Sequence, residues 1–68
     1  TYNRGQAFKL TNCPLYSSST AASPAGKVTG TYYLWDGKEL NGRYRITNAK
    51  HRDGVAGQVT GFVKKADL

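Results

Sequence analysis

Cysteine, acidic residues and long apolar runs are all scarce in this sequence. Cys13 is the one cysteine among 68 residues, so the chain cannot form a disulfide within itself. No apolar run approaches the length of a membrane-spanning helix, and no charged-then-apolar segment opens the chain as a signal peptide would. The sequence predicts one domain with a small core, because a chain of this length buries only about 60% of its unfolded surface.

Methionine is absent, and the chain begins at Thr1. These features favour a module excised from a longer protein over a processed small protein. Any export signal or catalytic unit would then lie elsewhere. The single thiol leaves the compartment open, because it suits both the cytosol and secreted proteins that use few cysteines.

Acidic residues number four against ten Lys and Arg, which gives a formal net charge of +6 and a pI near 9.8. A basic surface attracts anionic partners, such as nucleic acid, an acidic membrane face or an acidic polymer like teichoic acid. The simpler explanation is that the charge only keeps a small domain soluble. The charge therefore indicates a class of partner without choosing among its members.

The residues needed for catalysis are also few. A nucleophile would be Cys13 or a serine activated by a base, and His51 is the one histidine. Pro14 follows Cys13 directly and nothing marks the thiol as activated, so a buried structural cysteine is favoured. Asp36 and Asp53 lie in turn sequences. Neither metal-ligand spacing nor a phosphate-holding glycine loop is present, so we expect no enzymatic activity and no cofactor.

The segment 27–47, KVTGTYYLWDGKELNGRYRIT, contains the only Trp and four of the eight aromatic residues. Successive side chains of a strand point to opposite faces. One face would carry Val28, Gly30, Tyr32 and Leu34, and the other Thr29, Thr31, Tyr33 and Trp35. Both faces become aromatic or apolar toward the end, which is more than one core face requires. This surplus indicates a binding surface.

Short strand patterns separated by turns recur along the whole chain, and no segment keeps a helical apolar period over about ten residues. The expected strands are 7–11, 26–35, 43–47 and 55–63, with turns at 36–37, 41–42 and 53–54, an exposed Ser-rich loop over 17–25, and a helical or 3₁₀ turn within 64–68. Pro14 is expected to break the first strand because proline lacks a ladder donor. The pattern predicts an all-β fold, with a partly closed barrel favoured over an open sheet with exposed edges.

Aromatic and basic side chains are the best candidates for binding a ligand. Tyr and Trp combine a flat apolar face with a polar end, which suits stacking on a sugar ring or covering a peptide backbone. We expect two or three of Tyr16, Tyr32, Tyr33, Trp35 and Tyr44 to line one groove, although core packing suits each of them equally well. Arg43 and Arg45 are expected to face solvent, where they either hold a carboxylate or phosphate or form a solvated basic face. His51 is expected to be exposed beside Arg52, with ligand contact as the minority alternative.

The order of these segments resembles the bacterial Src-homology-3-like domains of cell-wall proteins. The resemblance covers residues 7–68 and rests on Lys27-Val28-Thr29-Gly30, on Gly42-Arg43-Tyr44-Arg45-Ile46, and on Gly61-Phe62-Val63 through Leu68, after a Leu15-Tyr16 pair and a small-residue loop. Three features depart from the family pattern: Phe62 replaces the usual Trp, 32–35 is unusually aromatic, and 48–58 looks extended. The ligand is therefore not carried over from the family.

The resemblance implies a partly open Src-homology-3-like barrel of about five to seven short strands with a long Ser-rich loop, formed by residues 7–68, with 1–6 as a linker or lead-in. Such domains follow the catalytic unit of endolysins, autolysins and amidases, and hold it on Gram-positive peptidoglycan. The implied function is a noncatalytic cell-wall-binding module of a secreted or phage-released protein that acts at the bacterial wall. The implied partner is a peptidoglycan peptide or cross-bridge, with teichoic acid as an additional candidate and no membrane contact.

Two alternatives remain from the residues alone. Small basic barrels bind single-stranded nucleic acid through aromatic platforms, although the basic residues here are scattered along the sequence. An exposed aromatic strand could instead pair two copies of the chain in a homo-oligomer. Competition between an oligonucleotide and purified wall separates the first alternative from wall binding.

Overall fold

The computed structural model describes residues 2–68. Its elements are β1 (Ala7–Leu15), β2 (Gly26–Leu40), β3 (Arg43–Thr47), the 3₁₀ turn η1 (Lys50–Arg52), β4 (Gly61–Lys64) and the 3₁₀ turn η2 (Lys65–Asp67). The described part of the chain contains strands and 3₁₀ turns but no α-helix. The all-β prediction is therefore confirmed.

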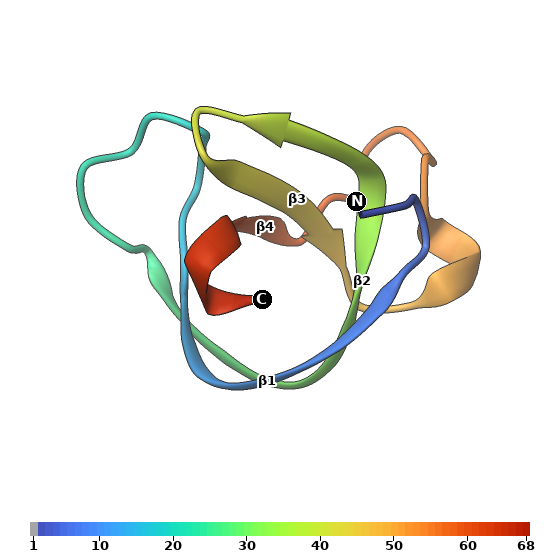
Figure 1. Cartoon of the computed structure of the whole chain (residues 1–68), viewed down its shortest axis with the longest axis horizontal. Coiled ribbons are helices and arrows are strands. Elements are labelled where there is room, and N and C mark those ends of the chain that lie inside the picture. The colour runs from blue at the N-terminus through green and yellow to red at the C-terminus, as the bar shows by residue number, and fades with distance from the viewer. Residues whose placement is uncertain (1) are drawn as a thin grey trace.

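The strands form one antiparallel sheet of four strands in the order β1-β2-β3-β4. Figure 1 shows the long strands β1 and β2 curving around the shorter β3 and β4, so that the sheet curls into a half-barrel. Its two edges meet at one bridge, where the Tyr16 N–H donates to the Phe62 carbonyl at 2.7 Å and the Phe62 N–H donates to the Tyr16 carbonyl at 2.9 Å. The bridge joins the end of β1 to β4, which shortens the edge left open to solvent.

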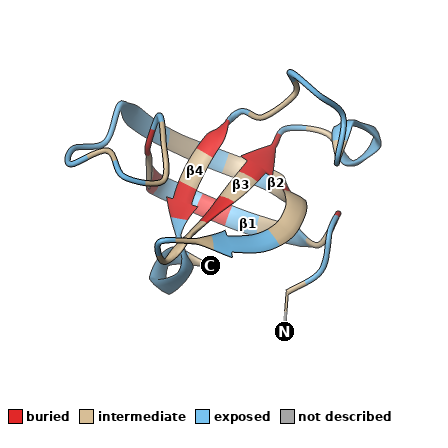
Figure 2. Ribbon diagram, turned by 90° about the horizontal axis from the view of Figure 1, so that it is seen from above, coloured by how far each residue is buried: buried red, intermediate tan, exposed pale blue. Residues whose placement is uncertain are grey.

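The core lies on the concave face of this curled sheet. Its buried cluster consists of Leu10, Cys13, Leu34, Tyr44, Ile46 and Val63. Figure 2 shows the buried residues gathered on the crossing strands, while the loops and the two 3₁₀ turns are largely exposed. Leu34 and Val63 are fully buried, and each such side chain stabilises the fold by about 1.5–3 kcal/mol.

Strand β1 continues through the Asn12-Cys13-Pro14 segment, so the prediction that it ends at residue 11 was wrong. The pairing with β2 shifts register between Leu10 and Cys13, and Asn12 adopts a positive φ of 48°. This bulge absorbs the irregularity, and pairing resumes with Cys13 opposite Val28 and continues with Pro14 opposite Lys27. Pro14 is accommodated beside the bulge, where the requirement for regular ladder bonds is relaxed.

Strand β2 also runs further than the sequence indicated, because Asp36-Gly37 forms a bulge and not a hairpin turn. The pairing with β3 shifts between Leu34 and Glu39, and Gly37 has a φ of 70°. The hairpin turn is Asn41-Gly42, whose φ values of 52° and 76° fit the left-handed conformations of a tight two-residue turn. The predicted turn at 41–42 and strand at 43–47 are confirmed.

The segment 48–60 contains η1 and irregular backbone, so the predicted hairpin with a strand over 55–63 was wrong. Only residues 61–63 of that range lie in a strand, β4 (Gly61–Lys64). The segment is held by single hydrogen bonds, in which the Gly54 N–H donates to the Trp35 carbonyl and the Thr60 N–H donates to the Ile46 carbonyl, each at 2.7 Å. Glycines at 54 and 57, both with positive φ, make the chain turn repeatedly where a ladder would need extended residues.

Residues 2–6 lie against the sheet. The Gly5 N–H donates to the Leu34 carbonyl at 2.7 Å, and the Leu34 N–H donates to the Gln6 carbonyl at 3.0 Å. The Ser-rich segment 17–25 is an irregular loop, as predicted. No helix within residues 2–68 has the length and apolar character needed to cross a bilayer.

Candidate functional site

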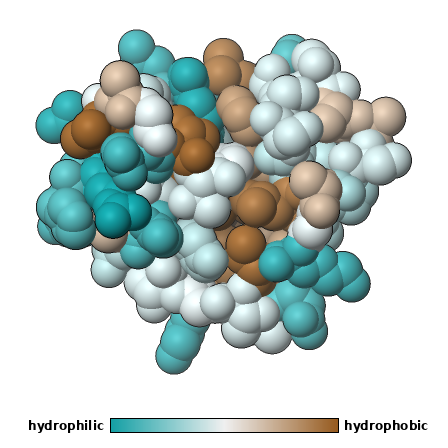
Figure 3. Space-filling view, turned by 180° about the vertical axis from the view of Figure 1, so that it is seen from behind, coloured by the Kyte–Doolittle hydropathy of each residue, from teal (hydrophilic) through white to brown (hydrophobic). Residues whose placement is uncertain are grey.

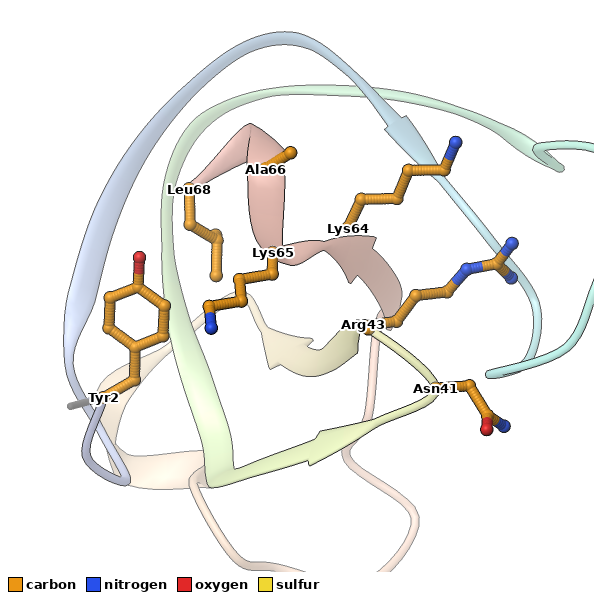
Figure 4. Close-up of a pocket in the computed structure, with 8 residues that line it drawn as sticks. Tyr2, Asn41, Arg43, Lys64, Lys65, Ala66 and Leu68 are labelled. Atoms are coloured by element: carbon orange, nitrogen blue, oxygen red, sulfur yellow. The ribbon is translucent and has the colours of Figure 1, made fainter.

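A pocket of about 640 Å³ lies at one open end of the half-barrel. Its lining residues are Tyr2, Asn41, Gly42, Arg43, Lys64, Lys65, Ala66 and Leu68. They come from the lead-in, the β2–β3 turn, the start of β3, the end of β4 and η2, and Figure 4 shows them around this opening. We call this surface the mouth pocket. It combines apolar side chains with several cations. Among residues 2–68, Val55 is the one large hydrophobic residue that is exposed, at 46%, and it does not line the pocket.

The turn between β2 and β3 positions the cationic side of the mouth pocket. Asn41-Gly42 reverses the chain, so that Arg43 begins β3 and pairs directly opposite Lys64 of β4. The Lys65 N–H donates to the Gly42 carbonyl at 2.9 Å, which fixes η2 against the turn. Backbone pairing therefore brings together basic residues that are far apart in the sequence.

Tyr2 forms the aromatic side of the mouth pocket. Its ring centroid lies 5.3 Å from that of Phe8 and 5.2 Å from that of Tyr44, both in edge-to-face geometry. Each such aromatic contact stabilises the fold by about 0.5–1.5 kcal/mol more than the burial of its surface area accounts for. Tyr2 thus packs on the core cluster with one edge while lining the pocket, and Figure 4 shows the Lys65 side chain extending toward it.

Arg43 connects the mouth pocket to the Ser-rich loop. Its guanidinium carbon lies 3.8 Å from the centroid of the Tyr16 ring, a cation–π distance. Its two terminal nitrogens donate to the Ser18 carbonyl at 2.9 Å and to the Ala21 carbonyl at 2.8 Å. The guanidinium therefore anchors loop 17–25, which has few other bonds to the sheet among the described residues.

The carboxylates of the described chain are mostly engaged away from Arg43 and Lys64. Asp36 pairs with Arg45 at 2.6 Å, and Asp53 pairs with Arg4 at 3.3 Å. Glu39 lies 3.7 Å from the Lys65 ammonium on an exposed surface, where such a pair contributes little. The Arg43 and Lys64 side of the mouth pocket therefore keeps its positive charge.

The structure divides the eight predicted site residues among several places. Tyr16 and Tyr44 are buried, with 5% and 7% of their surfaces exposed, so they are core residues and do not line an open groove. Tyr32 is half-buried and packs against the core cluster. Of the predicted residues, Arg43 is the one that lines the mouth pocket. Burial in the small core therefore removes Tyr16 and Tyr44 from an open groove, while a groove lined by the other predicted aromatic residues stays a prediction.

Trp35 and Arg45 form a second cluster away from the mouth pocket. The Trp35 Nε1–H donates to the Val55 carbonyl at 2.9 Å, and the Arg45 guanidinium carbon lies 5.2 Å from the indole ring. Arg45 also pairs with Asp36, and its side chain is 27% exposed. Arg43 and Arg45 lie on the face opposite the buried Tyr44 and Ile46 as predicted, but both are half-buried and bonded, and neither extends freely into solvent.

Tyr33 and His51 lie apart from both clusters. Tyr33 is half-buried and pairs with Ala7 on one side and Thr47 on the other, and His51 is exposed in η1. The prediction that His51 is exposed is confirmed, and ligand contact by either residue stays a prediction. Figure 3 shows the hydrophobic residues of one face in separate patches among hydrophilic ones.

Cys13 is buried, as predicted. Its Sγ–H donates to the carbonyl of the next residue, Pro14, at 3.7 Å. Burial, assisted by the negative charge of Asp67, raises the pKa of the Cys13 thiol. A raised pKa keeps the thiol protonated at neutral pH, whereas nucleophilic and metal-binding cysteines act as thiolates. Within residues 2–68 no group of three or more His, Cys, Asp and Glu side chains could hold a metal ion.

No protein-family model matches the chain, and no curated protein or solved structure matches it. The candidate site therefore rests on the geometry of the mouth pocket itself.

Of the eight residues that line the pocket, sequence reasoning found only Arg43, and the missed residues include Tyr2, Lys64 and Lys65. Tyr2 lies among polar residues, so nothing in the sequence indicated that its ring contacts Phe8 and Tyr44. The Lys64-Lys65 pair was a visible signal, since it adjoins the closing strand, but its position opposite Arg43 depends on the pairing of β3 with β4.

Proposed function

We propose that this chain is a noncatalytic cell-wall-binding module built on a partly open Src-homology-3-like barrel. The parent protein would be a phage endolysin or bacterial peptidoglycan hydrolase, and the module would hold its catalytic unit on the Gram-positive wall. The curled antiparallel sheet and the bridge between Tyr16 and Phe62 support the barrel. The segments that carry the family resemblance occupy β2, β3 and β4 of this sheet.

The observation that carries the proposal is the mouth pocket. Tyr2 and Leu68 offer apolar surface to a peptide or sugar, while Lys64 and Lys65 attract a polymer of negative charge. A Gram-positive wall presents both kinds of ligand together, as peptidoglycan and as anionic polymer.

Co-sedimentation with purified Gram-positive sacculi tests the proposal. We expect the domain to pellet with sacculi and the charge-reversed variant Lys65→Glu to bind about tenfold more weakly, since one charged contact is lost and one repulsion is gained. Lys65 is exposed, with 59% of its side chain accessible, so the variant should fold normally. Lys9→Glu is the matched control, because Lys9 is exposed in β1 and does not line the pocket.

Two outcomes would contradict the proposal. One is no binding to sacculi either before or after acid extraction of teichoic acid. The other is complete displacement from sacculi by an equal charge of single-stranded oligonucleotide together with tight, salt-dependent oligonucleotide binding, which would identify a nucleic-acid-binding barrel. Binding that survives extraction would identify peptidoglycan as the main ligand, and binding lost on extraction would identify the anionic polymer.

A further inference from the structure

We propose that Arg43 and Lys64, beside the ring of Tyr16, form a binding site for a phosphate group. This inference rests on the proposed function and names the part of the wall ligand that the cationic side of the mouth pocket takes. The chemical class is a phosphodiester of an anionic polyol-phosphate polymer. The site would give the module an attachment point separate from any contact with peptide or sugar.

The first observation is an unfavourable cross-strand pair. Arg43 and Lys64 lie directly opposite each other in the antiparallel pairing of β3 and β4. Like charges at directly opposite positions destabilise a sheet. A bound anion between them would convert this repulsion into attraction, so the pair is better explained by ligand binding than by stability of the sheet.

The second observation is that both cations gather at one aromatic ring. The Arg43 guanidinium carbon lies 3.8 Å from the Tyr16 ring centroid, and the Lys64 Nζ lies 5.5 Å from it. Tyr16 is buried and is fixed by its backbone bridge to Phe62, so the ring is a rigid support. Figure 4 shows the Arg43 and Lys64 side chains extending to the same side of the pocket.

The third observation is the absence of a neutralising partner. Among residues 2–68, neither Arg43 nor Lys64 takes part in an ion pair, while Asp36, Glu39 and Asp53 are paired with other cations. Arg43 donates to two backbone carbonyls, which order its guanidinium without cancelling its charge. The site is thus preorganised and positively charged before a ligand arrives.

The arrangement of donors favours a phosphate over a carboxylate. A carboxylate is held best by two parallel N–H groups of one arginine. Two of the five guanidinium N–H groups of Arg43 already bond to loop carbonyls, which leaves fewer donors for a parallel bidentate pair. A phosphate presents oxygens in several directions and suits single donors from separate side chains, with the lysine acting as a point charge. Lys65, at the other side of the same pocket and 3.7 Å from Glu39, is a third cation that could face the next phosphate of a polymer.

Thermal unfolding and amide NMR titration of the purified domain test the site. The probes are inorganic phosphate and sn-glycerol 3-phosphate, with acetate at the same ionic strength as the carboxylate comparison. We expect both phosphates to raise the Tm and to shift the amide signals of Arg43 and Lys64 more than acetate does, because a ligand that binds only the native state stabilises it. Lys64→Gln should weaken phosphate binding about tenfold, and Lys64→Arg should retain it.

Two matched measurements keep the outcome interpretable. Lys9→Gln removes the same charge from exposed β1 and should leave phosphate affinity within about twofold of the wild type, as expected for a distant exposed charge. In low salt without phosphate, Lys64→Gln should have an equal or higher Tm than the wild type, because the cross-strand repulsion is gone.

The inference is overturned if Lys64→Gln binds phosphate as tightly as the wild type, or if acetate matches phosphate in both assays. It is also overturned if Lys9→Gln weakens binding as much as Lys64→Gln, which would indicate general attraction by net charge. These results do not depend on sacculi. A domain that binds phosphate but not walls would contradict the proposed function alone, and one that binds walls but not phosphate would contradict this inference alone.

Discussion

At the scale of single residues, the core competes with the binding surface for a limited set of aromatic and polar side chains. Tyr16 and Tyr44 are drawn into the core, while Tyr2 is shared between the core and the mouth pocket. The Cys13 thiol is subject to the same competition, because it can either pack in the core or react at the surface. Its burial serves packing and removes the thiol from nucleophilic chemistry.

The Cys13 thiol gives a prediction for the dependence of stability on pH. Its pKa is raised in the folded state above the ordinary value of 9.0, first by burial and then by the charge of Asp67. The folded state therefore holds the proton more tightly than the unfolded state, so the stabilising contribution is present below pH 9.0 and is lost as pH rises through the raised pKa. We expect the free energy of unfolding to fall above pH 9.0 more steeply in the wild type than in Cys13→Ala, as measured by urea denaturation across pH.

The comparison of slopes isolates this thiol from the tyrosines and lysines that titrate in the same range, because both proteins share them. Cys13→Ala is expected to be less stable at every pH, since it leaves a cavity. Parallel pH profiles for the two proteins would show that the thiol is equally acidic in both states.

At the scale of elements, the irregular segments are held by a few specific bonds and not by ladders. Arg43 anchors loop 17–25 through two carbonyls, and Trp35 anchors segment 48–60 through its indole N–H to Val55. Thr47, which immediately precedes segment 48–60, is fully buried, and its hydroxyl has no partner in the described chain. Such segments open at lower free energy than the sheet, because few contacts must break.

Replacement of Trp35 by Phe tests the anchoring of segment 48–60. The variant keeps an aromatic ring but loses the indole hydrogen bond to the Val55 carbonyl, a loss of about 0.5–1.5 kcal/mol. We expect faster amide hydrogen exchange at Gly54, whose N–H donates to the Trp35 carbonyl, with unchanged exchange in β1. Tyr33→Phe, on the same face of β2, is the control. Equal protection of Gly54 in both variants would mean that the segment is held by other contacts.

At the scale of the whole molecule, the half-barrel depends on the meeting of its first and last strands. β1 and β4 join through Tyr16 and Phe62, and Gly61 lies at the closest approach. A Cβ at residue 61 would come within 2.6 Å of the Leu15 Cδ1 and 3.1 Å of the Tyr16 carbonyl oxygen. A side chain at this position would therefore displace the Leu15 side chain and press against the Tyr16 carbonyl oxygen.

Gly61→Ala is expected to lower the free energy of unfolding by about 1–3 kcal/mol through overpacking at this junction. The measurement is chemical denaturation followed by circular dichroism and tryptophan fluorescence. Gly26→Ala is the matched control, because a Cβ there has no atom within 4 Å. If Gly61→Ala and Gly26→Ala have equal free energies of unfolding, the junction accommodates the added methyl group without loss of stability.

The local pattern of the sequence was enough to predict the all-β class, the Asn41-Gly42 turn and the strand 43–47. Each depends on neighbours in the chain: alternation of side chains, and glycine or asparagine where φ is positive. Local pattern failed where tertiary pairing overrides it. Asp36-Gly37 has the composition of a hairpin turn, yet pairing with β3 makes it a bulge. Residues 55–60 include strand-forming types but form no ladder, and Thr60 makes a single bond to the Ile46 carbonyl of β3.

The sequence by itself determined that this is a small basic domain of short strands with one thiol and no internal disulfide. The tertiary structure decided where the basic and aromatic residues go. Curling of the sheet places Arg43 opposite Lys64 and brings Tyr2 against Tyr44, contacts between residues that are distant in the chain. The physical reason is that composition and periodicity are local, whereas a binding site arises from strand register and closure, which only the folded sheet fixes.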